Sequence, residues 1–393
     1  MENTAPQKLF NKCFILVWLA ALGLNITQNI LNNSVSLFIT SLGMSTGFAG
    51  FLGIPYAVCA ILMRFIGGSW ADRRSRRSLL VFGCMGFGIS SLLFGFLPMA
   101  VSLVIFRAVH GFCFSAGQLA CSTVNMDVTP PEKSTLGIGI FWVSTAVAFG
   151  AAGYMVTGLT SGGSYSPVFI ACAVSGILAG IAGLFCDYEK GRRQTVSAAN
   201  PSSDSYHGIL RFIEPRAWRP SILMFLMAAA NCSATLYLLL FAQERGYSNP
   251  GFAFLLAAFG MAVGNFFSDS LQRKIGARNL LILSFAFSAA CYCLMGLLPS
   301  YLTYCFGGIA CGYIQGICMP VLYYLGVKDM PSNRRGVSGG TVYFMLDLGV
   351  GIGSWLWGIL IDAAGFSATY TAAGILFLTG AVCSLLFYLR RKT

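Results

Sequence analysis

The sequence predicts an all-α membrane protein whose twelve transmembrane helices form two pseudo-symmetric six-helix bundles. Hydrophobic residues make up 56% of the 393 residues and charged residues only 10%, and the mean hydropathy is +0.73. This composition is too apolar for a soluble domain. The charges cluster between continuous apolar runs of about twenty residues, the length that spans a bilayer. A transmembrane β-barrel would instead alternate apolar and polar residues.

Twelve such runs follow one another along the chain. We expect spans at about 13–40, 47–70, 78–97, 100–127, 134–160, 167–187, 218–243, 250–270, 279–298, 301–327, 335–361 and 367–389. A polar stretch rich in Ser, Asn and Arg separates the sixth run from the seventh and reads as a linker. The predicted organisation is therefore an N-terminal bundle at 1–188, a cytoplasmic linker at 189–217 and a C-terminal bundle at 218–393.

The two halves repeat one another at an offset of 200 residues. The matching positions are Pro131, Gly139, Gly153 and Gly158 in the first half and Pro331, Gly339, Gly353 and Gly358 in the second. The charged segment of Asp72, Arg76 and Arg77 is echoed by Asp269 and Arg273. Parallel repeats of this kind place a substrate site near the bilayer midplane, between the halves.

The basic residues lie almost entirely in alternate loops. The chain has 25 Lys and Arg against 13 acids, a net charge of +12. All but Arg64, Arg107 and Arg245 fall in the termini and loops of one side. We therefore expect a multi-pass protein of the inner or plasma membrane, and the positive-inside rule places both of its termini in the cytoplasm. This distribution accounts for the positive charge without a nucleic-acid partner.

Metal, cofactor and enzyme chemistry find no support in the sequence. The 14 cysteines are scattered singly through the apolar runs, and only two histidines are present. We predict no metal site and no cofactor, because neither ligand spacing nor a phosphate-binding loop occurs. No nucleophile–base arrangement occurs either, so we predict that the protein is not an enzyme.

A conspicuous polar segment, 67–77, separates the second and third spans. It carries Gly68, Asp72, Arg73, Arg76 and Arg77, and we expect it to form a short gating loop, with Asp269 and Arg273 in the equivalent place of the second half. The acid could accept hydrogen bonds from a helix N-terminus or pair with an arginine, which would lock two helix ends together. Alternatively, the arginines only anchor the topology.

These motifs carry a family resemblance over the whole chain. Gly68-x-x-x-Asp72-Arg73-x-x-Arg76-Arg77 resembles the signature loop of twelve-helix transporters of the major facilitator superfamily, with Ser75 where glycine is usual. Arg107-x-x-His110-Gly111 resembles the motif in the fourth helix of that family, with His110 where glutamine is typical. The resemblance implies two bundles that rock about a central site, with Asp72 and Arg73 closing the inner side.

The eleventh predicted helix resembles the bacterial efflux members of the family. Its matching segment runs from Pro331-x-x-Arg334-Arg335-Gly336 to Asp347-x-Gly349-x-Gly351-x-Gly353. The fifth helix departs from the drug/proton antiporter pattern, because Gly150-Ala151-Ala152-Gly153 lacks the expected Gly-Pro pair. The resemblance therefore indicates the superfamily but leaves the substrate open.

Four amides form one face of the first predicted helix. Asn25, Gln28, Asn29 and Asn32 are spaced i, i+3, i+4 and i+7. Facing lipid, each would lose several kcal/mol through unmet hydrogen bonds. Helix–helix hydrogen bonding is the alternative, but four aligned amides favour a wet substrate cavity. Further candidates for the lining of this cavity are Tyr56, Gln118, Asn231, Thr235, Gln315 and Tyr323.

Three of the ionisable residues inside predicted spans are candidates for proton coupling. Asp347 is the acid placed deepest in a span, and a carboxylate there either pairs with a cation or takes a proton. Arg107 and His110 lie one turn apart in the fourth span, where the imidazole could titrate or the pair could bind an anion. The alternatives are a structural Asp347 bonded to neighbouring helices and a structural Arg107–His110 pair.

The function predicted from these features is secondary active transport of a small organic molecule across the lipid bilayer. Proton-coupled export by antiport is the first hypothesis, because the motifs are most similar to those of efflux permeases. Uptake of a polar or anionic metabolite, proton-coupled or facilitative, is the main alternative, favoured by the amide face and Arg107. A non-transporting receptor on the same fold is the other alternative. We expect the chain to function as a monomer.

Overall fold

The structure is a computed structural model that describes residues 9–73, 75–130, 133–187, 213–331 and 334–388, with the side chains at 67–73, 134–136 and 138 outside the description. No strand occurs within these residues, and ten of their helices are long and apolar enough to cross a membrane. The described elements up to the middle of the chain are α1 (Lys12–Ser41), α2 (Thr46–Phe51), α3 (Gly53–Arg73), α4 (Arg76–Phe96), α5 (Ala100–Val128), α6 (Ser134–Thr160) and α7 (Ser166–Leu184). The later elements are η4 (Pro215–Ala217), α8 (Trp218–Glu244), α9 (Phe252–Leu297), α10 (Tyr301–Val327) and α11 (Arg335–Phe387).

Two of the ten helices each consist of two helical segments joined at a kink. α9 contains Gly276 and α11 contains Gly365, with φ angles of 81° and 77°. This left-handed backbone is readily adopted by glycine, which has no Cβ to clash. Because each glycine divides its helix into two segments of membrane-spanning length, the fold has the twelve spans that the sequence predicts, with ends that agree within a few residues.

The polar segment at 67–77 is mostly helical. α3 continues to Arg73 and α4 begins at Arg76, so the expectation of a loop across the whole segment was wrong. Ser75 is the N-cap of α4. Its backbone is extended, and its hydroxyl accepts a hydrogen bond from the Ser78 N–H at 3.1 Å. A serine in this position satisfies a donor that would otherwise be orphaned at the N-terminus of α4.

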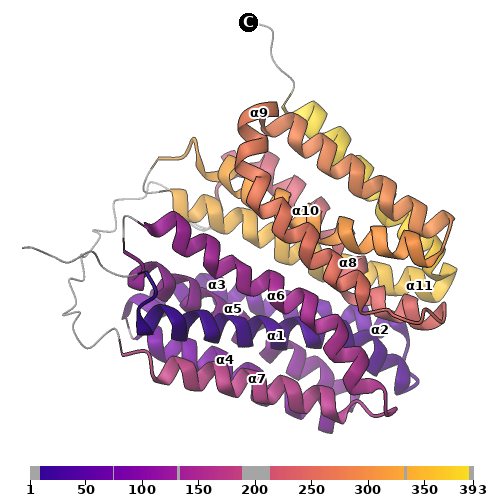
Figure 1. The fold of residues 1–393 in the computed structure, drawn as a ribbon, viewed down its shortest axis with the longest axis horizontal. Coiled ribbons are helices and arrows are strands. Elements are labelled where there is room, and N and C mark those ends of the chain that lie inside the picture. Colours follow the sequence, from indigo (N-terminus) through magenta and orange to yellow (C-terminus); the bar gives the residue numbers. More distant parts are fainter. Residues whose placement is uncertain (1–8, 74, 131–132, 188–212, 332–333, 389–393) are drawn as a thin grey trace, which may run out of the picture. The chain divides into compact units, whose positions relative to one another are not determined.

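The chain divides into two compact units that cross the sequence halves. Unit 1 holds the described residues of 1–31, 59–149 and 162–200, and unit 2 those of 32–58, 150–161 and 201–393. Unit 2 therefore contains α8 to α11 together with α2, the first turns of α3 and the last turns of α1 and α6. In unit 1, α4 packs against both α5 and α7, and in unit 2, α10 packs along α9 and α11 along α8 (Figure 1).

Small residues bring these helices into backbone contact. In unit 1, a Cβ built on Gly88 would lie 3.0 Å from the Gly176 Cα, and in unit 2 one on Gly353 would lie 2.7 Å from the Ala229 carbonyl oxygen. Close approach of this kind stabilises helix pairs in membranes, where apolar burial between helices gains little over lipid.

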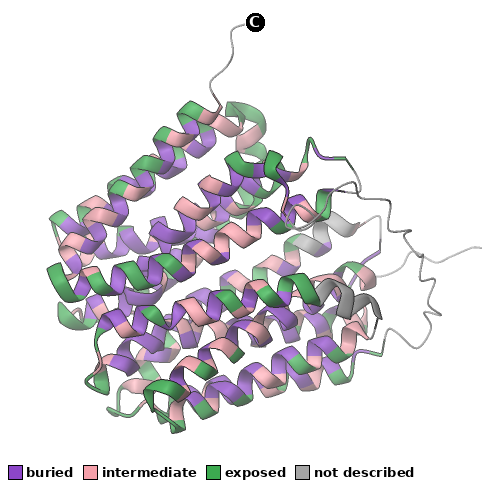
Figure 2. Cartoon of the chain, turned by 180° about the vertical axis from the view of Figure 1, so that it is seen from behind, coloured by how far each residue is buried: buried purple, intermediate pink, exposed green. Residues whose placement is uncertain are grey.

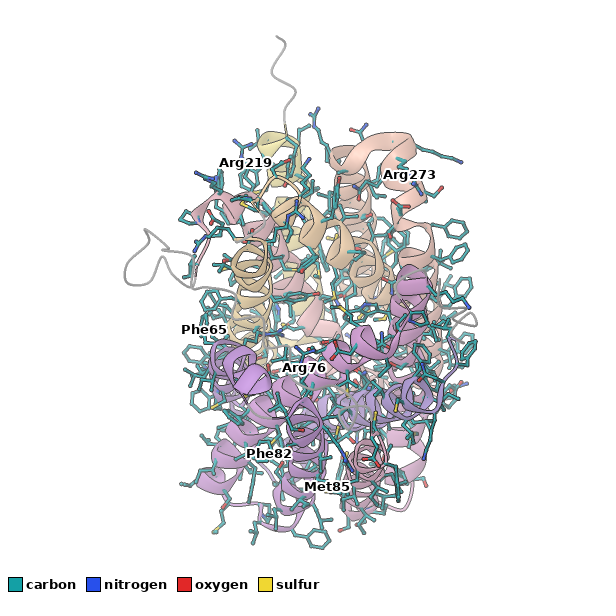
Figure 3. All side chains as sticks on the ribbon, turned by 90° about the vertical axis from the view of Figure 1, so that its left-hand side faces the viewer. Phe65, Arg76, Phe82, Met85, Arg219 and Arg273 are labelled. Carbon is teal, nitrogen blue, oxygen red and sulfur yellow. The ribbon has the colours of Figure 1, made fainter. Side chains whose placement is uncertain are left out.

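Several helices also keep an exposed apolar stripe. On α4 this stripe consists of Phe82, Ile89, Leu93 and Phe96, which share one helical face. Exposed and buried positions alternate along the helices in Figure 2, and Phe65 and Phe82 carry two of the exposed rings labelled in Figure 3. Exposed rings and aliphatic chains suit contact with hydrocarbon, as expected for helices that face lipid.

Candidate functional site

The amide face predicted on α1 is a feature of the folded helix. Asn25 is buried, whereas Gln28, Asn29 and Asn32 are half-buried. The side-chain amides of Asn25 and Asn29 each donate to the carbonyl four residues earlier, Ala21 and Asn25, at 2.8 Å. Two donors are thus satisfied along the helix itself, and the three half-buried amides keep a polar edge on α1.

In unit 2 the structure brings two of the predicted cavity residues together. Asn231 on α8 donates to the carbonyl of Cys311 on α10 at 3.2 Å, and Gln315 donates to the same carbonyl at 3.4 Å. The Tyr292 hydroxyl on α9 donates to the Asn231 side-chain oxygen at 2.9 Å. This cluster joins three helices. Tyr292 escaped sequence reasoning, because a single tyrosine in an apolar run does not reveal its partner.

The other predicted cavity residues are dispersed. Gln118 lies half-buried on α5 in unit 1, and its side-chain oxygen accepts no hydrogen bond from the described residues. Tyr56 is buried in the part of α3 that belongs to unit 2. Thr235 donates to the Cys232 carbonyl within α8, and Tyr323 on α10 is exposed, with its ring 5.4 Å from that of Tyr343.

His110 lies in an aromatic clamp inside unit 1. Its side chain is fully buried on α5, and its ring centroid lies 5.4 Å from that of Phe87 and 5.5 Å from that of Phe94. Neither ring nitrogen has a hydrogen bond of good geometry to a described residue. Arg107, one turn earlier, is buried as well. α5 thus carries two adjacent ionisable groups in the interior of a membrane span, where such groups are rare and usually functional.

In unit 2, Asp347 on α11 is a buried ionisable residue inside a membrane span. It lies near the middle of the segment of α11 that precedes Gly365 and is only 8% exposed. The glycines that follow hold α11 against α8: a Cβ on Gly349 would lie 2.7 Å from the Phe225 carbonyl oxygen. Asp347 therefore lies beside a tight backbone contact between two helices, away from the ends of its own helix.

The arginines of the predicted gating segment bridge helix ends within unit 1. Arg76 donates to Asp127 at the end of α5 at 2.5 Å, and Arg77 donates to Asp187 at 2.5 Å and to the Leu184 carbonyl. Gly68, Asp72 and Arg73 lie outside the residues whose side chains are described, so their gating role stays a prediction.

The equivalent segment of the second half behaves differently. Arg273 pairs with Asp269 one turn earlier on α9, and both side chains are exposed by more than 70% (Figure 3). Such exposed pairs within one helix contribute little to stability. Among the described side chains, Arg76 and Arg77 thus bond to residues outside their own segment, whereas Arg273 pairs with Asp269 inside its own.

A buried ion pair in unit 2 was not foreseen. The Arg334 guanidinium, just before α11, donates to the Glu214 carboxylate at 2.8 Å, and both side chains are only 4% exposed. Arg334 also donates to the Ile213 carbonyl at 3.2 Å, and Glu214 accepts from the Arg216 N–H at 3.3 Å. Residues 213–217, predicted as the end of a linker, are therefore anchored to the start of α11.

Over the described ranges, no three His, Cys, Asp or Glu side chains come together in a way that could hold a metal ion. The candidate site is thus made of polar and ionisable side chains inside membrane spans, which suits recognition and proton transfer more than bond-making catalysis.

Comparisons with known proteins agree with this architecture. The chain is 25% identical over 348 residues to the uncharacterized MFS-type transporter YceJ of Bacillus subtilis, covering 85% of this chain and 86% of the relative. It is 24% identical to the class E tetracycline resistance protein of Escherichia coli, with 77% of each chain covered. It is 23% identical to the multidrug resistance protein 2 of Bacillus subtilis, with 83% of this chain and 82% of the relative covered.

Solved structures share the fold at lower identity. A bacterial homolog of the human lysosomal transporter Spinster, in an inward-facing and occupied conformation, superposes with a TM-score of 0.76 at 16% identity over 97% of both chains. The nucleoside transporter NupG gives a TM-score of 0.74 at 10% identity, over 96% of this chain and 100% of the other. The sequence profile of the Major Facilitator Superfamily matches residues 14–259 and 222–393. The chain belongs to the Major Facilitator Superfamily of membrane transporters, a family of transporters and not of enzymes.

Proposed function

We propose that this transporter exports a small organic molecule in exchange for protons. The observation that carries the proposal is Asp347, an acid buried near the middle of a membrane span. An ionised carboxylate in that environment is costly, so it favours a proton or a cationic partner. The names of several relatives, which are tetracycline and multidrug resistance proteins, favour export as the direction.

Alternating access supplies the mechanism for this exchange. In one access state Asp347 takes a proton, and in the other it releases the proton while the two bundles rock about a central site. The half-buried amides of α1 and the side-chain oxygen of Gln118, which accepts no hydrogen bond from a described residue, offer hydrogen bonds to a polar part of the substrate. Arg107 and His110 are the second candidate pair for proton or anion binding, and Asp72 with Arg73 is proposed to close the inner side.

The proposal includes a topology and an assembly state. Both termini lie in the cytoplasm of an inner or plasma membrane, since the basic residues gather in the loops of that side. The turns at 42–45 and 363–365 then face the outside. Twelve spans can enclose a pathway within one chain, so a monomer is proposed as the functional unit.

Uptake is the second candidate function, favoured by a specific observation. The amides of α1 and the buried Arg107 would suit a polar or anionic metabolite better than an apolar drug. The two functions predict opposite proton movements when the substrate flows down its own gradient. Export by antiport moves protons against the flow of substrate, and uptake by symport moves them with it.

The test uses purified protein in liposomes that contain a pH-sensitive dye. Drugs, sugars, amino acids, nucleosides and organic acids are added in turn, with empty liposomes as the control. Export by antiport predicts that a compound entering the liposomes drives protons out. Proton entry with the compound would support symport instead, and substrate flux without proton movement would refute proton coupling.

A further inference from the structure

A tight seam in unit 2 joins the start of the second membrane span to the eleventh. We call this contact the α2–α11 seam. It runs along Gly47, Gly50 and Gly53 on one side and Gly351, Ser354 and Gly358 on the other. α2 passes through a single turn residue, Leu52, into α3, so that Thr46–Ile66 forms one span.

Backbone meets backbone at two points of the seam. A Cβ on Gly50 would collide with the Ser354 carbonyl oxygen, and one on Gly358 with the Thr46 carbonyl oxygen. Ser354 donates to the Gly50 carbonyl at 2.9 Å, and the buried Tyr237 hydroxyl of α8 donates to the Ser354 carbonyl at 2.8 Å. Small residues make these contacts, and beside them the rings of Phe51 on α2 and Trp355 on α11 lie with their centroids 6.4 Å apart, so parting of the two faces would also separate this ring pair.

Asp362 closes the end of the seam. Its carboxylate accepts from the Thr46 N–H at 3.0 Å, from the Gly47 N–H at 2.6 Å and from the Thr46 hydroxyl, which also lies 3.1 Å from a second acceptor, the Gly358 carbonyl oxygen. The first N–H groups of a helix have no partner within that helix. Here α2 supplies one cap of its own, the Ser45 hydroxyl, which accepts from the Phe48 N–H at 3.1 Å. The other two donors are satisfied from α11.

Within the described part of the chain, the hydrogen bonds that the Asp362 carboxylate accepts all come from Thr46 and Gly47 of α2. No Lys, Arg or His pairs with it among the residues that the structure describes, and the helix dipole of the second span favours a negative charge at this end. The Asp362 side chain is exposed, so water can replace the Thr46 and Gly47 donors when α2 and α11 separate. Since the two helices belong to different sequence repeats, they must part at one end during alternating access.

We propose that Asp362 is a latch that holds the α2–α11 end of the transporter closed. The carboxylate keeps its three donors only while the seam is closed, and therefore stabilises that access state relative to the open one. Asp362 is a positioning residue in this role, with no contact to substrate required. The proposal goes beyond the proposed export function and holds for either direction and any coupling ion.

The test measures separation at this end without any substrate. Spin labels are placed at Leu42 and Leu298, exposed residues of unit 2 that lie in turns of the first and second sequence halves. The partly exposed cysteines Cys13, Cys59, Cys293 and Cys383 are replaced by serine in all samples. The distance distribution in lipid nanodiscs is then recorded by pulsed dipolar electron paramagnetic resonance.

Asp362→Asn keeps the shape of the side chain but removes the charge and one acceptor. We expect the ratio of closed to open molecules to fall by roughly two- to thirty-fold, the range for loss of a helix cap or a charge at a helix end. Gly50→Leu supplies the open reference, because its side chain cannot fit against Ser354. An unchanged distribution in Asp362→Asn, with a longer distance in Gly50→Leu, would overturn the latch.

Ser45→Ala is the matched control. It removes a cap from the same end of α2, one whose hydrogen bond to the Phe48 N–H stays within that helix. The latch predicts that this variant keeps the wild-type distances. If Ser45→Ala opened the seam as much as Asp362→Asn, the effect would come from fraying of α2, and the latch would be refuted. Neither result depends on finding the substrate.

Discussion

The buried ion pair between Glu214 and Arg334 leads to a sharp prediction about stability. Glu214→Ala would leave the Arg334 guanidinium at a site where the wild-type side chain is only 4% exposed. Removing one partner of a buried pair costs about 3–5 kcal/mol, because the remaining charge is desolvated without compensation. The Ile213 carbonyl still accepts from Arg334 at 3.2 Å, so we expect the cost to lie near the lower end of that range.

An exposed pair on the same unit provides the comparison. Asp269 and Arg273 form the same type of contact, but with 71% and 75% of their side chains exposed. Water and salt screen such a pair, so Asp269→Ala is expected to cost at most about 1 kcal/mol. The free energy of unfolding would be measured by denaturant titration of both variants in the same lipid–detergent micelles.

Removing both buried charges completes the test. Glu214→Gln combined with Arg334→Met leaves no isolated charge, so we expect this double variant to be more stable than Glu214→Ala. Equal losses for Glu214→Ala and Asp269→Ala would refute the argument, because burial is the difference on which it depends.

Three further predictions concern the gate, the packing and the cavity. Asp72→Asn is expected to leave substrate binding intact but to slow turnover strongly in liposomes; wild-type turnover would exclude a gating role. The new side chain of Gly312→Leu would collide with the Ala257 carbonyl, so this variant should lose about 3 kcal/mol or more of unfolding free energy. Gly139→Leu is the control: a Cβ built on Gly139 meets no described atom within 4 Å, so the substitution should be tolerated. Gln118→Leu is expected to raise the KM for a polar substrate several-fold with an unchanged melting temperature, since its side-chain oxygen has no partner among the described residues; an unchanged KM would remove it from the cavity.

The fold could be predicted because its causes are local. Twenty apolar residues must span hydrocarbon, and clustered charges must stay outside it, so composition alone located all twelve spans. The glycines at Gly276 and Gly365, which reverse the chain between spans, also lie in polar or small-residue segments that mark turns. The prediction of a loop across 67–77 was wrong because a helix can continue beyond the hydrocarbon region on polar residues.

The candidate site could be predicted only in part, because pairing is not local. The depth of Asp347 and the adjacency of Arg107 and His110 follow from position within a span. The aromatic clamp of His110 depends on α4, which packs beside α5, and no periodicity in α5 indicates it.

Two contacts that were not predicted join residues far apart in the chain. Asp362 meets Thr46 across 316 positions, and Glu214 meets Arg334 across 120. In the sequence, Asp362 is only an acid at the end of a span, and Glu214 is only one charge of a polar linker. Contacts of this range require knowledge of which helices pack together.

Proton-coupled exchange through Asp347 can be tested by comparing two modes of transport. Once a transported compound is known, uphill transport driven by an imposed pH gradient and substrate-for-substrate exchange are measured in the same liposomes, for the wild type and Asp347→Asn. If Asp347 carries the coupled proton, Asp347→Asn loses gradient-driven accumulation and keeps exchange. Undiminished uphill transport by Asp347→Asn would contradict this prediction and return Asp347 to a structural role between α8 and α11.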